Sequence, residues 1–229
     1  MNNAPVMGRS IPDPGFFQQY GVNVQNVDDI SWQPIVDHLA YPAAGSLTLN
    51  FFANGNGQGA TSALNAAAGP KTFADTNLEG NGALPVPERA LIVGLSIDVY
   101  PGVAPTATGA LAASLFMQDV WQIARSGYLL WQIGQKRVAL DAPLIKFGSA
   151  GSLGGFAAMA DSTTAGATQF TQVNYASIQS PIYSIVPVAI PSSQNFPLTL
   201  NWPALVPTPS TVAARIGVTL HGYRIRLAQ

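Results

Sequence analysis

The sequence lacks cysteine and has few charged residues. None of the 229 residues is cysteine, so neither a disulfide framework nor a thiol metal site can form. Lys and Arg number 10 and Asp and Glu number 11, which together make 9% of the chain, against roughly 25% in ordinary soluble domains. The net charge of −1 argues against a sequence-wide attraction to nucleic acid or to anionic lipid.

Histidine and long apolar runs are equally scarce. His38 and His221 are the only histidines, whereas a cupin-type metal site needs several clustered His and acidic ligands. No stretch approaches the roughly 18 consecutive apolar residues of a membrane-spanning helix. We therefore expect no metal, no cofactor and no enzymatic activity.

Three short stretches resemble active-site motifs but lack the context that such motifs need. The sequence "AGSLG" places Ser152 as in a nucleophile elbow, yet no strand–turn–helix pattern surrounds it. The sequence "GNGQGA" at 55–60 lacks the third glycine of a dinucleotide-binding loop. In "AAGPKT", Pro70 replaces the glycine that a phosphate-binding loop needs before its lysine, Lys71. All three are interpreted as loops.

Two small groups of charged residues could bind ions. Asp28, Asp29 and Asp37 could hold a cation, although solvated acids are far more common and Ca²⁺ sites require more oxygen ligands at set spacings. Arg224 and Arg226 are candidate contacts for the phosphates of lipid or genome. The more common alternatives for these arginines are solvation, or an intersubunit pair with Asp98 or Glu88.

The overall composition indicates a protein surface with few charged residues. Hydrophobic residues make up 48% of the chain, which is ordinary, so the low charge reflects the surface. A soluble monomer normally has a charged surface, whereas the centres of protein interfaces are depleted in charge. We expect a subunit that packs against copies of itself. A secreted domain with a neutral surface is the alternative.

Alternating apolar residues predict an all-β protein. Strands are expected in "SLTLNFF" (46–52), "RALIVGLSIDVY" (89–100), a hairpin over 128–141, one or two strands over 170–190, and "FPLTLNWP" (196–203). In the second of these, the odd-numbered residues from Leu91 to Val99 should share one face. Helical spacing over 114–127, with Gly127 as C-terminal cap, predicts one short helix. Two long loops, after residues 52 and 142, complete this part of the chain.

The closing segment "RIGVTLHGYRIRLAQ" changes the phase of its apolar residues. Ile216, Val218 and Leu220 fall on even positions, whereas Tyr223 and Ile225 fall on odd ones. A β-bulge at His221-Gly222 would produce this change and would bend one long strand between two parts of a curved sheet. Two short strands joined by a glycine turn are the alternative.

The N-terminal 40 residues are rich in proline, and we expect them to form an extended arm. Its aromatic residues need a surface to lie on, belonging either to the same subunit or to a neighbour. The candidate assembly contacts are Phe16, Phe17, Tyr20 and Trp32. With residues 41–229 as the body, the predicted fold is a single eight-stranded antiparallel jelly roll. We expect its core to contain Leu47, Leu49, Leu91, Val93, Leu95, Ile97, Leu198, Leu200, Ile216, Val218 and Leu220.

The layout of residues 89–229 resembles that of jelly-roll major capsid proteins of tailless icosahedral bacteriophages. The resemblance lies in "DVWQIARSGYLLWQIGQKRVALDAPLIKFGSAGSLGGFAA", in "SSQNFPLTLNWP" and in "AARIGVTLHGYRIRL". It implies self-assembly into a virion shell, with other virion proteins and an internal membrane or packaged genome as partners. Many family members carry two jelly rolls, whereas this chain is long enough for one.

The distribution of basic residues indicates whether such a shell protein could itself bind a packaged genome. Arg9 is the only basic residue in the first 40 positions, so this arm cannot neutralise a packaged genome, and we expect no strong direct binding of nucleic acid. One alternative function is a receptor- or carbohydrate-binding module that stacks sugars on Trp32, Trp121 or Trp131. A cupin-like enzyme is the second alternative.

Overall fold

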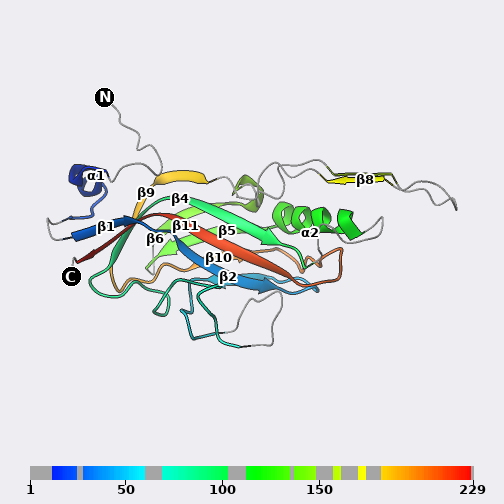
Figure 1. Cartoon of the computed structure of the whole chain (residues 1–229), viewed down its shortest axis with the longest axis horizontal. Coiled ribbons are helices and arrows are strands. Elements are labelled where there is room, and N and C mark those ends of the chain that lie inside the picture. Colours follow the sequence, from blue (N-terminus) through cyan, green and yellow to red (C-terminus); the bar gives the residue numbers. More distant parts are fainter. Residues whose placement is uncertain are drawn as a thin grey trace, which may run out of the picture.

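A computed structural model describes residues 12–24, 28–59, 69–102, 112–134, 137–147, 157–160, 170–173 and 182–227. Antiparallel strands are the main secondary structure of this part of the chain, in which only one helix has seven or more residues (Figure 1). The all-β prediction is therefore confirmed. Ser152 and most of the second long loop lie outside the described residues.

The strands form two main sheets and one small one. Sheet A contains β1 (Asp28–Trp32), β2 (Ile35–Tyr41), β4 (Arg89–Tyr100), β9 (Tyr183–Ile190) and β11 (Ala214–Leu227). Sheet B contains β3 (Thr48–Phe51), β5 (Tyr128–Ile133), β6 (Arg137–Pro143) and β10 (Leu198–Asn201). The small sheet pairs β7 (Ala157–Ala160) with β8 (Phe170–Val173). The helices are α1 (Pro14–Gln19), α2 (Ala112–Ser126) and the 3₁₀ turn η1 (Leu144–Phe147).

The pairings between strands are nested along the chain. The pair β5–β6 is joined directly, β4 pairs with β9 around it, β3 pairs with β10, and β2 pairs with β11. The chain therefore passes through β2, β3, β4 and β5, and each of these strands pairs with a strand from the later part of the chain: β11, β10, β9 and β6, respectively. Successive pairs alternate between the two sheets, with β2–β11 and β4–β9 in sheet A and the other two in sheet B.

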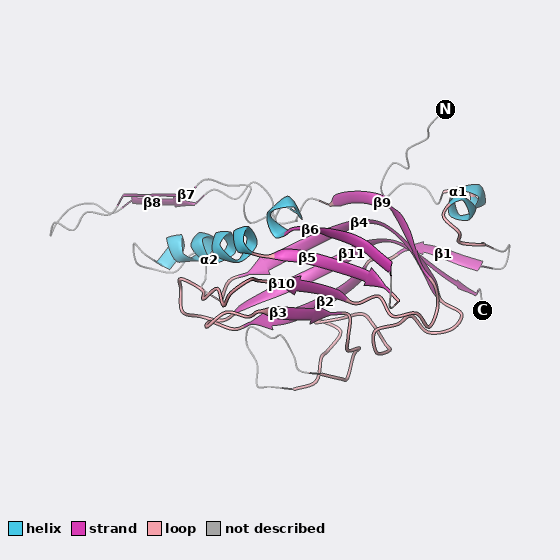
Figure 2. Cartoon of the chain, turned by 180° about the vertical axis from the view of Figure 1, so that it is seen from behind, coloured by secondary structure: helices cyan, strands magenta, loops and turns pink. Residues whose placement is uncertain are grey.

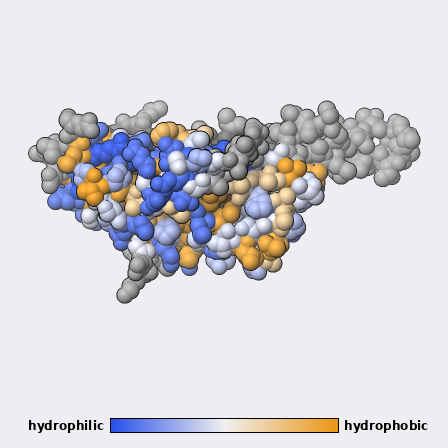
Figure 3. Space-filling model, turned by 90° about the horizontal axis from the view of Figure 1, so that it is seen from below, coloured by the Kyte–Doolittle hydropathy of each residue, from blue (hydrophilic) through white to orange (hydrophobic). Residues whose placement is uncertain are grey.

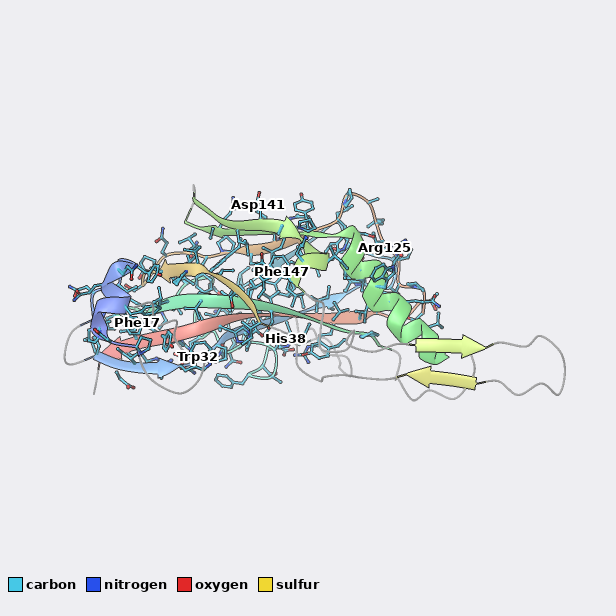
Figure 4. The ribbon with its side chains drawn as sticks, turned by 90° about the horizontal axis from the view of Figure 1, so that it is seen from above. Phe17, Trp32, His38, Arg125, Asp141 and Phe147 are labelled. Carbon is cyan, nitrogen blue, oxygen red and sulfur yellow. The ribbon has the colours of Figure 1, made fainter. Side chains whose placement is uncertain are left out.

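The main core lies between the two sheets, which form two layers in Figure 4. Each strand places alternate residues on its inner face, and these residues meet across the gap. Seven of the predicted core residues are fully buried there: Leu95, Ile97, Leu198, Leu200, Ile216, Val218 and Leu220. Leu49 is only partly buried against this core. The prediction was wrong for Leu47, which precedes β3 and is 53% exposed.

A register shift divides sheet A. Strand β11 pairs His221 with Gly94 but pairs the next residue, Gly222, with Ile92. The predicted irregularity at His221-Gly222 is therefore confirmed, and β11 is one continuous strand. The extra residue is Val93 of the partner strand β4, which has no pairing partner in β11. A bulge of this kind reverses the facing of every following residue in the bulged strand.

The bulge corrects the predicted facing of β4. On one side of the bulge, the odd-numbered Leu95, Ile97 and Val99 face the main core. On the other side, the even-numbered Ala90 and Ile92 face it instead. Leu91 and Val93 instead join a second cluster on the opposite face of the sheet. The prediction that all odd-numbered residues from Leu91 to Val99 share one face was therefore wrong.

The second cluster explains the phase change in β11. Tyr223 and Ile225 keep the strand's regular alternation and point to the outer face, where they are buried with Phe17 of α1. The apolar phase changes because a different face of the sheet is covered at this end. The strand itself does not reverse.

Residues 14–19 are helical, which corrects the extended conformation predicted there. Asp13 caps this helix by accepting a hydrogen bond from the Gly15 N–H, and Pro14 occupies the first helical position, where its missing N–H costs nothing. Strands β1 and β2 follow, and both pair with β11, one on each side of the bulge.

The predicted helix over 114–127 is confirmed as α2. Gly127 follows it, but a Cβ at this position would lie 2.5 Å from Leu144 Cδ1 and 2.7 Å from Trp202 Nε1. Glycine is therefore needed here because neighbouring side chains approach closely. Figure 2 shows α2 lying beside one end of the sandwich.

Replacing Gly222 with alanine tests the bulge. A Cβ at this position would lie 2.1 Å from the Leu91 carbonyl oxygen and 2.8 Å from Ile92 Cα, so the β4 backbone would have to move. We expect Gly222→Ala to lower the free energy of unfolding by about 2–3 kcal/mol in denaturant titrations. Thr219→Ala, on the same strand beyond the bulge, is the control and should change it by less than about 1 kcal/mol. Equal small effects would contradict the close approach.

Candidate assembly surface

The four predicted assembly residues pack within the second cluster, against the chain's own sheet A; Figure 4 labels two of them, Phe17 and Trp32. Phe17 is fully buried and packs edge-on against Tyr223, with ring centroids 5.4 Å apart. Trp32 makes a similar contact with Tyr223 at 5.0 Å, and Phe16 contacts both Phe17 and Tyr20. Phe16, Tyr20 and Trp32 are partly exposed, whereas Phe17 has no surface left for a neighbour.

The two candidate phosphate contacts share one carboxylate. Arg224 is buried and pairs with Glu88, and Arg226 Nε lies 3.1 Å from the other carboxylate oxygen of Glu88. Arg224 therefore has no exposed surface with which to reach a phosphate in the isolated chain. The Arg226 side chain is 44% exposed and lines an open groove of about 360 Å³ beside Pro85.

The three acids that were considered as a cation site do not form a common site. Asp28 pairs with Arg89 at 2.8 Å, and Asp37 is fully buried against Lys71. Asp29 is exposed. Among the described residues, no group of three or more His, Cys, Asp or Glu could hold a metal ion.

The tryptophans differ in their access to solvent. Trp131 is fully buried, so it cannot stack on a sugar. Trp121, on the outer face of α2, is 51% exposed and is the most accessible of the three tryptophans that were considered for sugar stacking. Within the described residues, no helix is both long and apolar enough to cross a membrane.

Large exposed apolar side chains gather around α2, at the end of the sandwich that we call the apolar end. On the face drawn in Figure 3, hydrophobic residues are present toward the right, the side on which Figure 1 places α2, and also at the left end, while hydrophilic residues dominate left of the middle. Each member of the apolar end is between 42% and 59% exposed: Leu47, Trp121, Tyr128, Ile145, Leu205 and Val212.

Polar contacts hold these loops and α2 together. The Trp202 N–H donates to the Leu47 carbonyl at 2.9 Å, and the Trp202 indole donates to the Ile123 carbonyl of α2 at 3.0 Å. The Tyr41 hydroxyl donates to the Val206 carbonyl at 2.6 Å, and burial raises the pKa of Tyr41 to about 12. The apolar side chains therefore project from a fixed frame, by which we mean α2 and the neighbouring loops held together by these hydrogen bonds.

Asp119 of α2 adds a further tie to the loop before β11. It is fully buried and accepts hydrogen bonds from the Ser210 N–H at 2.9 Å and from the Ser210 hydroxyl at 2.5 Å. Burial raises the pKa of Asp119, and the bonds from Ser210 oppose that rise. Removing this carboxylate would leave two buried donors without an acceptor.

Sequence reasoning did not identify the apolar end. Its members come from four separate segments, and Leu47 continues the alternation of the strand that follows it, which suggested a core residue. The signal that was available is the unusual apolar content of the loop around Leu205, which carries no charged residue between Trp202 and Ala214.

Comparison of the chain with protein-family models, with curated proteins and with solved structures finds no match.

Both histidines are partly buried on sheet A and make specific hydrogen bonds. His38 Nδ1 lies 2.9 Å from the Asp75 carbonyl oxygen, and His221 Nε2 lies 2.9 Å from the Ser96 hydroxyl. Burial lowers the pKa of each imidazole below 6.5, and for His38 the charge of Arg215 adds to that effect. The folded chain therefore binds protons at these sites less readily than the unfolded chain.

The lowered pKa values of both histidines predict that the folded chain loses stability in mild acid. Below pH 6.5 the histidines of the unfolded chain bind protons that those of the folded chain do not bind. The free energy of unfolding should therefore fall as the pH is lowered from about 7 to 5. The slope is at most about 1.4 kcal/mol per pH unit for each histidine. Urea titrations of the wild type and of the double variant His38→Gln/His221→Gln would measure it. The wild type should lose stability relative to the variant, and parallel curves would contradict the assignment.

Proposed function

We propose that this chain is a major capsid protein that tiles with copies of itself into the shell of a tailless icosahedral bacteriophage. The order of strand pairing carries the proposal. Setting β1 and the small sheet aside, eight strands pair as nested partners and alternate between two facing sheets. A long hairpin wrapped into two sheets is the arrangement of a jelly roll, a fold that viral capsid proteins share with lectins and cupins.

The surface supports a structural role over the other uses of this fold. Only 9% of the chain is charged, and five ion pairs among the described residues engage nine charged residues, with Glu88 shared by two pairs. Several of the nine are buried: Asp37, Lys71, Asp75, Glu88 and Arg224. Even less charge therefore remains on the exterior than the composition suggests. Such a surface suits repeated packing against neutral neighbours.

The apolar end supplies a place for contact with a second copy. Large exposed apolar patches on a monomer mark interaction sites, and this one stands on a frame fixed by Trp202, Tyr41 and Asp119. A rigid surface loses little conformational entropy on binding. Closure of a shell multiplies many weak contacts of this kind.

Within this function, the virion would hold its genome by other means. The basic residues of the described structure are largely engaged by acids of the same chain, as in the pairing of Glu88 with Arg224 and Arg226. A packaging motor, an internal membrane or separate virion proteins would then confine the nucleic acid.

Assembly of the purified chain tests the proposal. We expect size-exclusion chromatography with light scattering, together with electron microscopy, to find capsomers or shells. Leu205→Asp should raise the concentration required for assembly at least about tenfold, because placing a charge at an apolar contact costs more than about 1.4 kcal/mol. Val86→Asp is the matched control, because Val86 is 72% exposed but lies beside the Arg226 groove, away from the apolar end.

Two outcomes would contradict the proposal. A wild-type chain that stays monomeric at high concentration would contradict self-assembly. A monomer or trimer that binds glycans, and loses that binding in Trp121→Ala, would favour a carbohydrate-binding module, because Trp121 presents the exposed ring that sugar stacking requires.

A further inference from the structure

A lysine and an aspartate meet inside the sandwich, where charged residues are rarely found. Asp37 lies on the row of β2 that faces the main core, between Ile35 and Leu39. Its Oδ1 atom is 2.5 Å from Lys71 Nζ, and the two side chains are 0% and 1% exposed. Lys71 comes from the long loop between β3 and β4, 34 residues along the chain.

Burial favours the uncharged form of the Asp37 carboxyl. Removing an ion pair from water carries a desolvation cost that its mutual attraction offsets only in part. Burial raises the pKa of the Asp37 carboxyl, and the charge of Lys71 opposes that rise. Transfer of one proton from Lys71 to Asp37 gives an amine in contact with a carboxylic acid, with no change in the total charge of the pair.

Two backbone N–H groups point at the same carboxyl. The His38 N–H donates to Oδ1 at 3.0 Å, and the Phe52 N–H donates to Oδ2 at 2.7 Å. Phe52 has a φ of +61°, a left-handed conformation that is an outlier for a bulky residue and that occurs at functional sites. A fixed N–H at Oδ2 is placed to stabilise negative charge that develops on that oxygen.

We propose that Lys71 and Asp37 join in an intramolecular amide bond, formed by the folded chain without any cofactor. The neutral Lys71 amine attacks Cγ of Asp37, and the negative charge of the tetrahedral intermediate falls on Oδ2, which the Phe52 N–H holds. Oδ1 already carries the proton first transferred from Lys71, takes a second one from the attacking nitrogen, and leaves as water. One N–C bond forms, one C–O bond breaks, and Oδ2 remains as the amide oxygen.

The bond would close a loop of 34 residues in a chain that has no cysteine for a disulfide. It would fix the β3–β4 loop to β2 and so tie this surface loop to sheet A. A covalent cross-link restricts the unfolded chain whatever the protein's function. The inference therefore stands independently of the proposed capsid role.

Intact-mass spectrometry of the full-length, denatured protein tests the proposal directly. We expect the wild type to weigh one water molecule less than its sequence requires. Lys71→Arg keeps a buried cation but cannot form this lysine amide, so it should have the full mass of its sequence. This control also reports any other loss of water, or any processing, common to both proteins.

Digestion with trypsin locates the bond. No Lys or Arg lies between Arg9 and Lys71, and the next is Arg89. Unmodified protein should therefore release peptides 10–71 and 72–89. A lysine in an amide bond resists trypsin, so the wild type should release a single species spanning 10–89, lighter by one water, whereas Lys71→Arg should release both separate peptides.

The result that overturns the proposal is equally definite. A wild-type mass equal to that of the sequence, or cleavage after Lys71 at the same rate as in Lys71→Arg, would mean that Asp37 and Lys71 form only a buried ion pair. A missing water that trypsin places outside 10–89 would also overturn it. These readouts need no assembly, so their failure is distinguishable from failure of the capsid proposal.

Discussion

The antiparallel pairing of β4 with β11 is the constraint on which the rest of the structure depends. Both strands are long and central in sheet A, and the single extra residue between Ile92 and Gly94 reverses the facing of β4. One sheet can thereby cover the main core over most of its length and, at its end, bury a second cluster under Phe17. The close approach at Gly222 is what permits the shift.

The two ends of the sandwich are held together by different contacts. The end beyond the bulge is covered by α1 and by the paired residues Glu88, Arg224 and Arg226. At the other end, hydrogen bonds from Trp202 and to Asp119 fix α2 and the neighbouring loops, yet apolar side chains there remain open to solvent. Val86 and Leu227 are also exposed beside Arg226, so it is the hydrogen-bonded support, more than exposure alone, that favours the apolar end as a contact surface between copies within the proposed function.

Local patterns were sufficient to predict β3, β4, β5, β6, β10 and β11, the helix α2, and the place along β11 at which the register shifts. They did not predict β1, β2 or β7, and they placed the extra residue in β11, whereas it lies in β4. They could not predict the facing of Leu91 and Val93, because an extra residue in β4 leaves no break in a run whose residues are apolar on both faces. Pro14 suggested an extended arm although proline is well tolerated at the first position of a helix. Asp37 was considered only as part of a cation site and Lys71 only in a failed phosphate-loop motif, because the tertiary fold alone brings together residues so far apart in the chain. The apolar end was missed for the same reason.

The register of β4 against β11 is best tested with pairs of introduced cysteines, since the chain has none of its own. In the shifted register Tyr223 lies opposite Leu91, and both belong to the cluster under α1. Oxidation of Tyr223→Cys/Leu91→Cys should therefore form a disulfide, whereas Tyr223→Cys/Ile92→Cys, which an unshifted ladder would place face to face, should stay reduced because its side chains point to opposite faces. Efficient bridging of the second pair and not of the first would contradict the division of sheet A into two faces.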